Sequence, residues 1–363
     1  MDGGPYGMTL WVVKLGTSLL RGDTAATIEG YASGIAAAMR RGDQVVLVTS
    51  GAVGLGCQQL RLPRRPDAVV ALQAAAATGQ GYLMALYERA MAVHGISVAQ
   101  VLLTRSDLVD RRRYENASGT LQQLLAWGVL PVINENDALS SAELRFGDND
   151  TLSALVAAAV GAHQLLLLTD VDRLYSSDPR LDVNAQPITD VRHPRDLKQL
   201  EAGAGNGGRW GTGGMTTKLA AARIATGSGV TVHLADGRDP ARLSGLLEGD
   251  RGGTVFHPHP EPLGNRRSWL AHVLVPEGEL CLDQGACQAL MYRGASLLLV
   301  GVTAVKGEFD ANQAVLLRDP DGQELGRGLC LLNSNQVRQA LVGTSAEASP
   351  VVVHRDALVL QDR

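Results

Sequence analysis

The sequence predicts an α/β protein with a mostly parallel central sheet, followed by a small β-rich domain. Up to about residue 250, short apolar runs alternate with segments of helical spacing, which is the pattern of successive βαβ units. Hydrophobic residues make up 45% of the 363-residue chain and aromatic residues only 4%. Strands of this composition, rich in Val, Leu and Ala, are typical of parallel sheets buried on both faces.

The first domain is expected to contain alternating strands and helices. Apolar runs predict strands at residues 11–15, 44–50, 96–104, 129–134, 164–170 and 230–237. Spacing and terminal residues predict helices at 24–41, 67–94, 113–127, 150–161 and 216–227. We expect the second helix to break near Thr78 and Gly79, and we expect a glycine-rich turn in TSGAVGLG, at residues 49–56.

A change in composition marks the domain boundary. Gly, Pro, His and Arg replace the alternating pattern over residues 250–268, which predicts a first domain at 1–255, a linker at 256–268 and a second domain at 269–363. Short runs predict strands in the second domain: HVLVP, LLLVGVTAV, AVLLRD, GLCLLN and PVVVH. This domain has seven basic and eleven acidic residues, so it carries the whole net charge of −4.

Charge and hydropathy exclude several classes of protein. A net charge of −4 argues against general binding to nucleic acids or anionic membranes. The first residues lack the basic and long apolar regions of a signal peptide. The most apolar window, 152–169, contains Gly161, His163 and Gln164, so it predicts a buried helix and strand instead of a membrane span. The four cysteines form no CxxC pair, as expected for reduced thiols in a cytoplasmic protein.

Polar residues gather where the predicted strands end. Five clusters follow strands, at residues 14–18, 49–51, 104–107, 134–137 and 169–170. Ligands of open α/β sheets bind at the carboxyl edge of the strands. Loop turns would account for one or two such clusters, so five on one edge favour a binding site.

The segment GTGGMTTK, residues 211–218, is a candidate phosphate-binding loop. Its spacing is not that of a Walker A motif. Glycine amides and the start of the following helix can nevertheless hold an anion, with Lys218 on the first helical turn. The alternative is a flexible surface connector.

Lys14 and Asp150 are candidates for the same site. Lys14 ends an apolar strand, where it either extends to solvent or faces a phosphate as a second cation. In Asp148-Asn149-Asp150 one residue suffices to cap the helix that follows, so three suggest a further role, and Asp150 could hold the two lysines apart. The acid and amide groups of residues 134–137 suit the ammonium and carboxylate of a small amino acid.

These motifs together resemble the amino acid kinase family, and within it the glutamate 5-kinases. The resemblance rests, in chain order, on VVKLGTSLL, VLVTSGAVGLG, LLTRSD, PVINENDA, FGDNDTLSALVA, LLLLTDVDRLYSSDPR and GTGGMTTK. The second domain, with LDQGACQALMYRGASLL, is similar to PUA modules. The resemblance implies a three-layer αβα sandwich and ATP-dependent phosphorylation of the L-glutamate γ-carboxylate, the first step of proline biosynthesis.

The resemblance also implies roles for individual residues. Lys14, Lys218 and Asp150 correspond to the catalytic residues, and the glutamate-binding residues correspond to Ser50, Asp137, Asp148 and Asn149. The ATP-binding residues correspond to Lys14, Thr169, Asp170, Thr212, Gly213, Gly214, Met215, Thr216, Thr217 and Lys218. Mg²⁺ is expected on the ATP phosphates, without a protein metal site. Arg173 departs from the family's usual glycine, which puts nucleotide affinity in question.

Three alternatives stay open at this point. A sister kinase acting on aspartate, acetylglutamate, carbamate or UMP would share the fold and the lysines. An RNA-binding protein is suggested by PUA modules elsewhere, although the charge of the second domain opposes it. A catalytically inactive homologue is disfavoured by the presence of both lysines and Asp150. The family further implies feedback by proline and a homo-oligomer.

Overall fold

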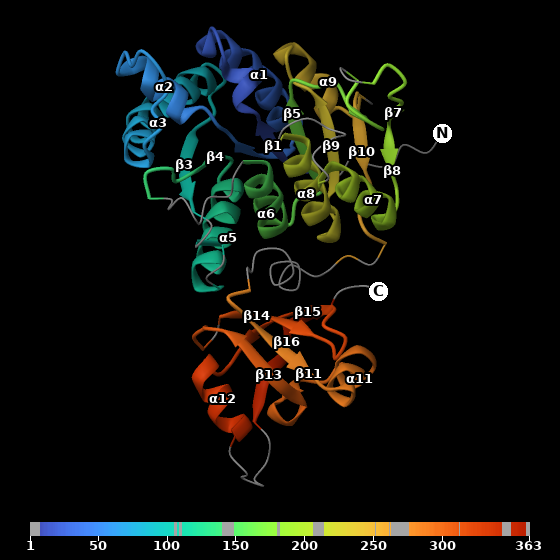
Figure 1. Ribbon diagram of the computed structural model, residues 1–363. Helices are drawn as coiled ribbons and strands as arrows, with labels where there is room; N and C mark the ends of the chain where they lie inside the picture. The colour runs from blue at the N-terminus through green and yellow to red at the C-terminus, as the bar shows by residue number, and fades with distance from the viewer. Residues whose placement is uncertain are drawn as a thin grey trace. The chain divides into compact units, whose positions relative to one another are not determined.

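The structure is a computed structural model that divides into two compact units, Met1–Pro262 and Leu263–Arg363 (Figure 1). It describes residues 8–104, 107–108, 111–139, 149–179, 182–205, 214–250, 252–260, 262, 276–311, 313–342 and 350–360. The assignment of residues 256–268 to a linker stays a prediction.

An eight-stranded sheet forms the centre of the first unit, in the order β3-β4-β2-β1-β5-β9-β10-β8. The first six strands in this order are parallel, β10 is antiparallel to β9, and β8 is parallel to β10. In chain order the strands are β1 (Leu10–Leu15), β2 (Gln44–Val48), β3 (Val98–Leu103), β4 (Leu130–Glu135), β5 (Gln164–Thr169), β8 (Asp190–Val191), β9 (Thr231–Asp236) and β10 (Thr254–Phe256). The predicted mostly parallel sheet is confirmed.

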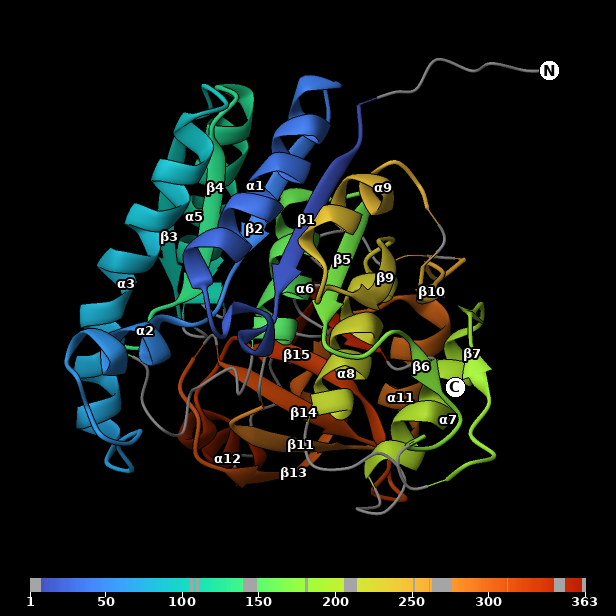
Figure 2. The ribbon, with the colours of Figure 1, turned by 90° about the horizontal axis from the view of Figure 1, so that it is seen from above.

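Helices cover both faces of this sheet (Figures 1 and 2). One layer contains α1 (Thr24–Arg40), α2 (Ala52–Gln59), α3 (Val69–Ala92) and α9 (Leu243–Leu247). The opposite layer contains α5 (Arg111–Ala126), α6 (Asn149–Val160), α7 (Pro194–Gly205) and α8 (Gly214–Gly227). Apolar side chains of α1, α3 and α9 meet those of the central strands in one buried core. The three-layer αβα sandwich is therefore confirmed.

Two glycine-rich segments differ from the prediction, the first in the extent of its turn and the second in having no helix break. In TSGAVGLG only Gly51 has the left-handed conformation of a turn, with φ of 104°, and the later glycines belong to α2. Helix α3 continues without a break through Thr78 and Gly79. A Cβ on Gly79 would lie 1.9 Å from the carbonyl oxygen of Ala52, and one on Gly56 would lie 1.7 Å from that of Ala75. These glycines let the backbones of α2 and α3 touch, which is why they stand inside helices.

Helix α3 is also long and apolar enough to cross a membrane, judged by length and composition alone. It has 24 residues, and an 18-residue window has a mean hydropathy of 1.3. The core helix of a soluble protein passes the same test. In this structure α3 packs against α1 and α2, and its Tyr87 hydroxyl bonds to Thr49 next to β2.

The second unit is a small β-rich domain with its own core. Its six-stranded sheet has the order β12-β16-β15-β14-β11-β13. The strands are β11 (Gly278–Leu282), β12 (Leu297–Leu298), β13 (Val302–Gly307), β14 (Ala314–Arg318), β15 (Glu324–Cys330) and β16 (Val351–Leu360), with helices α11 (Gln284–Arg293) and α12 (Ser334–Val342). The sheet's inward side chains form a separate hydrophobic cluster. The predicted β-rich domain is confirmed.

Some details of the second domain differ from the prediction. The run LLLVGVTAV forms two strands separated by a 3₁₀ turn at Leu299–Gly301, because Gly301 packs closely on Ala286 of α11. Strand β11 and both helices were not expected. Residues 272–275 of the HVLVP run lie outside the described residues. The four cysteines are free thiols.

Replacing Gly79 should destabilise the first unit. We expect Gly79→Ala to raise the cost of packing α3 on α2 and to lower the free energy of unfolding by roughly 1–3 kcal/mol, because the added methyl meets backbone atoms. Gly81→Ala is the matched control, since nothing lies within 4 Å of its Cβ, and it should stabilise α3 by about 0.5–1 kcal/mol. Urea unfolding of both variants measures the difference, and equal effects would contradict the close packing.

His233 should make stability depend on pH. Burial lowers its pKa from 6.5 to about 4, with a smaller contribution from His257, and its Nε2 bonds to Gln164 Oε1 at 2.7 Å. Because the unfolded state binds the proton first, stability is complete above pH 6.5 and falls by about 3 kcal/mol toward pH 4. In His233→Gln this part of the pH dependence should disappear. Thermal unfolding of both proteins between pH 4 and 7.5 tests this, and parallel curves would contradict it.

Candidate active site

The candidate site lies at the carboxyl edge of the parallel strands, where the sequence places its polar clusters. Lys14 stands near the end of β1, Ser50 follows β2, and Thr169 ends β5. Asp150 is the second residue of the neighbouring helix α6. Strand order brings β1 between β2 and β5, so these residues share one edge.

Asp150 lies between two lysines. One carboxylate oxygen, Oδ1, is in a close ion pair with the Lys14 ammonium. The other, Oδ2, is 3.1 Å from Lys218 Nζ and accepts a hydrogen bond of 3.0 Å from Thr217 Oγ1. Lys218 Nζ also donates to the carbonyl oxygen of Gly214 at 3.1 Å. The structure thus brings Asp150 together with Lys14 and Lys218, two residues that lie more than 200 positions apart in the sequence.

The charges at this cluster do not balance. Asp150 is 2% exposed and Lys14 is 5% exposed. Burial by itself would raise the pKa of the Asp150 carboxyl, but the two ammonium groups outweigh burial and hold that pKa below its ordinary value. Two positive charges around one negative charge leave this three-residue cluster with one positive charge in excess. An anion such as a phosphate group would complete the charge balance.

A chain of hydrogen-bonded amides lies beside this cluster. Asn149 Nδ2 donates to the carbonyl oxygen of Thr49 at 2.5 Å, to Ser50 Oγ at 2.8 Å and to Asn134 Oδ1 at 2.9 Å. Asn134 Nδ2 donates in turn to Gln80 Oε1 at 2.9 Å. Of the predicted glutamate-binding residues, Ser50 and Asn149 are therefore in direct contact. Asp137 lies half-buried in the turn after β4, and Asp148 lies outside the described residues.

Two residues of these hydrogen-bonded amides, Asn134 and Gln80, were not predicted from the sequence. Asn134 belonged to a predicted polar cluster but was not singled out. Gln80 had no local signal, because it is one glutamine in an alanine-rich helix 54 positions away from Asn134. Only the packing of α3 against the sheet edge brings it to the site.

The predicted nucleotide side of the site is described in part. Thr169 is buried, its hydroxyl donates to Asp170 at 3.2 Å, and its carbonyl oxygen accepts a bond from the Gly237 amide at 2.8 Å. Arg173 pairs with Asp172 at 2.9 Å. Thr212 and Gly213 lie outside the described residues.

The described half of GTGGMTTK is helical instead of a glycine turn. Helix α8 begins at Gly214, two residues earlier than predicted, so Met215, Thr216 and Thr217 form its first turn with Gly214. Lys218 follows as the fifth helical residue. The amide N–H groups of a first turn have no partner within their helix and can bind an anion.

Metal-binding side chains do not cluster in the described part of the chain. Within it, no group of three or more His, Cys, Asp or Glu residues could hold a metal ion. Both Asp150 oxygens are occupied by lysine or threonine donors.

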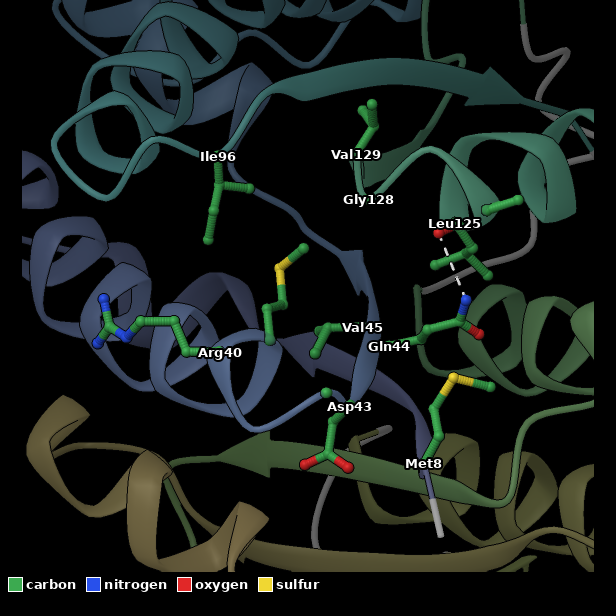
Figure 3. A pocket seen from close by; sticks show the side chains of 12 residues that line it. Met8, Arg40, Asp43, Gln44, Val45, Ile96, Leu125, Gly128 and Val129 are labelled. Atoms are coloured by element: carbon green, nitrogen blue, oxygen red, sulfur yellow. Dashed lines mark hydrogen bonds between the residues drawn. The ribbon is translucent and has the colours of Figure 1, made fainter.

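A separate hollow lies at the opposite edge of the sheet (Figure 3). It has a volume of about 360 Å³ and is lined near the amino ends of β2 and β4 by Met8, Gln44, Val45, Leu125 and Val129, among others. Gln44 Nε2 bonds to the carbonyl oxygen of Leu125 at 3.4 Å. This hollow is lined mostly by apolar residues and holds none of the predicted site residues.

Comparisons with known proteins agree on one family. The family model "Amino acid kinase family" matches residues 9–236, and the model "PUA domain" matches residues 278–352. A glutamate 5-kinase of Synechococcus sp. strain CC9902 is 93% identical over 98% of this chain and 100% of its own length. One from Synechococcus sp. strain CC9605 is 79% identical over the same shares. A carbamate kinase from Giardia lamblia, solved with AMP-PNP, has a similar fold, with a TM-score of 0.51 and 19% identity over 70% of this chain and 99% of its own.

Removing the Asp150 charge should destabilise the first unit. Asp150→Asn leaves the buried ammonium group of Lys14 and the partly buried one of Lys218 without their counter-ion, and we expect a loss of about 3 kcal/mol in the free energy of unfolding at pH 7. Because the pKa of Asp150 is lowered in the folded state, its contribution is complete above the ordinary carboxyl range and is lost as pH falls through the folded-state value. Urea unfolding at pH 7 and at acid pH measures this contribution. The exposed Asp196→Asn is the control, and equal effects of both substitutions at pH 7 would speak against the ion-pair cluster.

Proposed function

The chain belongs to the glutamate 5-kinases of the amino acid kinase family, and we propose that its lysine–aspartate cluster is the place of phosphoryl transfer. Glutamate 5-kinase transfers the γ-phosphoryl group of ATP to the γ-carboxylate of L-glutamate, giving γ-glutamyl phosphate for proline biosynthesis. The single observation that carries the assignment of the site is the pairing of Lys14 and Lys218 with opposite oxygens of Asp150.

The reaction needs little proton chemistry from the protein. A glutamate side chain has an ordinary pKa of ~4.3, so the attacking carboxylate is already ionised near neutral pH. The difficulty is to bring this anion to a polyanionic nucleotide and to stabilise charge on the group in transfer. Phosphoryl transfer is accelerated mainly by positioning and electrostatics, which two oriented ammonium groups supply.

Lys14, Lys218 and Asp150 divide this work. Lys14 and Lys218 contact the transferring phosphoryl oxygens from two sides. Asp150 orients both ammonium groups through its two oxygens, so they need little rearrangement during the reaction. Thr217 donates a hydrogen bond to Asp150 Oδ2, the same oxygen that pairs with Lys218.

The substrates occupy the two sides of this cluster in our proposal. Glutamate lies toward Ser50, Asp137 and the segment Asp148–Asn149, where the hydrogen-bonded amides are described. ATP lies toward Thr169, Asp170 and residues 212–218, where the first turn of α8 offers free amides. The excess positive charge between them faces both reacting groups.

A divalent cation, which we propose to be Mg²⁺, would be held mainly by ATP phosphates and water. The contacts of Asp150 fit this, because both of its carboxylate oxygens already face lysine or threonine donors. When bound, Mg²⁺ would neutralise part of the charge of the ATP phosphates.

We propose that proline inhibits this enzyme and that its chains form a homo-oligomer, as the resemblance to the family implies. Proline carries the same α-ammonium and α-carboxylate as glutamate, so groups that bind the amino-acid end of glutamate could also bind proline as a feedback inhibitor. We further propose that this homo-oligomer works in the cytoplasm.

Lys218 should be required for turnover but not for folding. Lys218→Met removes one of two cations at the phosphoryl group, so we expect kcat to fall by roughly 10²- to 10⁴-fold. Lys218→Arg keeps the charge with different geometry and should retain more activity. The assay measures ADP release with and without L-glutamate and Mg²⁺, and thermal unfolding checks the fold.

The control for this experiment is Lys198→Met on α7, which lies exposed on the surface. It should match the unsubstituted enzyme. Near-normal turnover by Lys218→Met would reject the assignment of the site.

A further inference from the structure

Gln80 has a buried hydrogen-bond donor without a partner. Its side chain, on α3, is 8% exposed, and Oε1 accepts a bond from Asn134 at 2.9 Å. Its Nε2 is fully buried and finds no hydrogen-bond partner among the described residues. An unsatisfied buried donor costs about 1–3 kcal/mol. A group of this kind beside a binding site points to a ligand that accepts its hydrogen bond.

Two backbone groups fix which end of Gln80 is the donor. The Glu135 amide can only donate, so the Asn134 atom 2.9 Å from it is the oxygen. The Thr49 carbonyl can only accept, so the Asn149 atom beside it is the nitrogen, and this nitrogen also donates to the Asn134 oxygen. Asn134 must therefore present its side-chain nitrogen to Gln80, and Gln80 accepts this hydrogen bond with its oxygen, Oε1. The group of Gln80 without a described partner is therefore its NH₂ group, and this assignment does not depend on which way the side-chain amides were placed.

The strand order places Gln80 at the amino-acid end of the substrate. Gln80 contacts β4, and β4 is two strands away from β1, which carries Lys14. At the usual spacing of neighbouring strands this is about 10 Å. If the γ-carboxylate of glutamate lies at Lys14 for phosphoryl transfer, the extended substrate reaches with its α-carbon toward β2 and β4.

We propose that Gln80 Nε2 donates a hydrogen bond to the α-carboxylate of the bound amino acid. Gln80 is then a specificity-determining contact, supplied by α3 and held in its orientation by Asn134. This inference rests on the proposed function, because it places the γ-carboxylate at the lysine cluster. It explains why a glutamine stands at the end of the amide chain, where it is buried with one polar atom unused.

The test compares Gln80→Glu with the unsubstituted enzyme. Glutamate at position 80 keeps an acceptor for Asn134 but turns the donor into an acceptor that repels a carboxylate. We expect KM for L-glutamate to rise roughly 10- to 100-fold while KM for ATP stays within about twofold. We also expect the thermal stabilisation by L-glutamate to vanish and that by ATP with Mg²⁺ to remain. Gln122→Glu, exposed on α5, is the charge-matched control and should leave all values unchanged.

A second substrate identifies the group that Gln80 contacts. 4-Aminobutyrate is glutamate without its α-carboxylate, so the preference for L-glutamate over 4-aminobutyrate, as a ratio of kcat/KM, should narrow about 10-fold in Gln80→Glu. Gln80→Met adds no charge and decides the question if Gln80→Glu does not fold. An unchanged KM for L-glutamate in a folded variant would overturn the proposal, as would an equal rise of both KM values. Failure of the unsubstituted enzyme to phosphorylate L-glutamate would instead refute the proposed function.

Discussion

The ion pairs of Asp150 with Lys14 and Lys218 are the interaction on which the rest of the site depends. A carboxylate that is 2% exposed could not stay charged without the two ammonium groups, and these would repel each other without the carboxylate. The sheet and helices bring the three groups together from β1, α6 and α8. The fold thereby gives this cluster one excess positive charge, at the place where, in our proposal, the anionic nucleotide and the anionic acceptor meet.

The layer of α1, α2 and α3 supports the other half of the site. Close glycine contacts let the backbone of α2, the helix that follows β2, touch the middle of α3. From this helix Tyr87 bonds to Thr49, and Gln80 bonds to Asn134, seven residues and thus about two helical turns earlier. This mostly apolar helix therefore contributes two polar side chains where its face meets the strand ends.

The candidate site and the β-rich domain belong to different units of the chain. Every described residue of the lysine cluster and of the amide chain belongs to the first unit, and the second unit has its own sheet and core. The acidic balance of the second domain is unlike that of a surface that tracks a nucleic-acid backbone. The two match separate family models, which suits a catalytic domain joined to an independent module.

The sequence by itself determined the α/β class and the order of the main strands and helices, because periodicity is a local property. It also predicted that Lys14, Asp150 and Lys218 share one site, and the structure brings these three side chains into contact. It misjudged Gly79, since a glycine that breaks a helix and one that lets two helices touch look alike until the partner helix is known. Gln80 was not recognised either, because its chemistry comes from Asn134, a neighbour that only packing supplies. Local pattern specifies elements, whereas contacts between distant segments decide which side chains meet, and these depend on how whole layers pack.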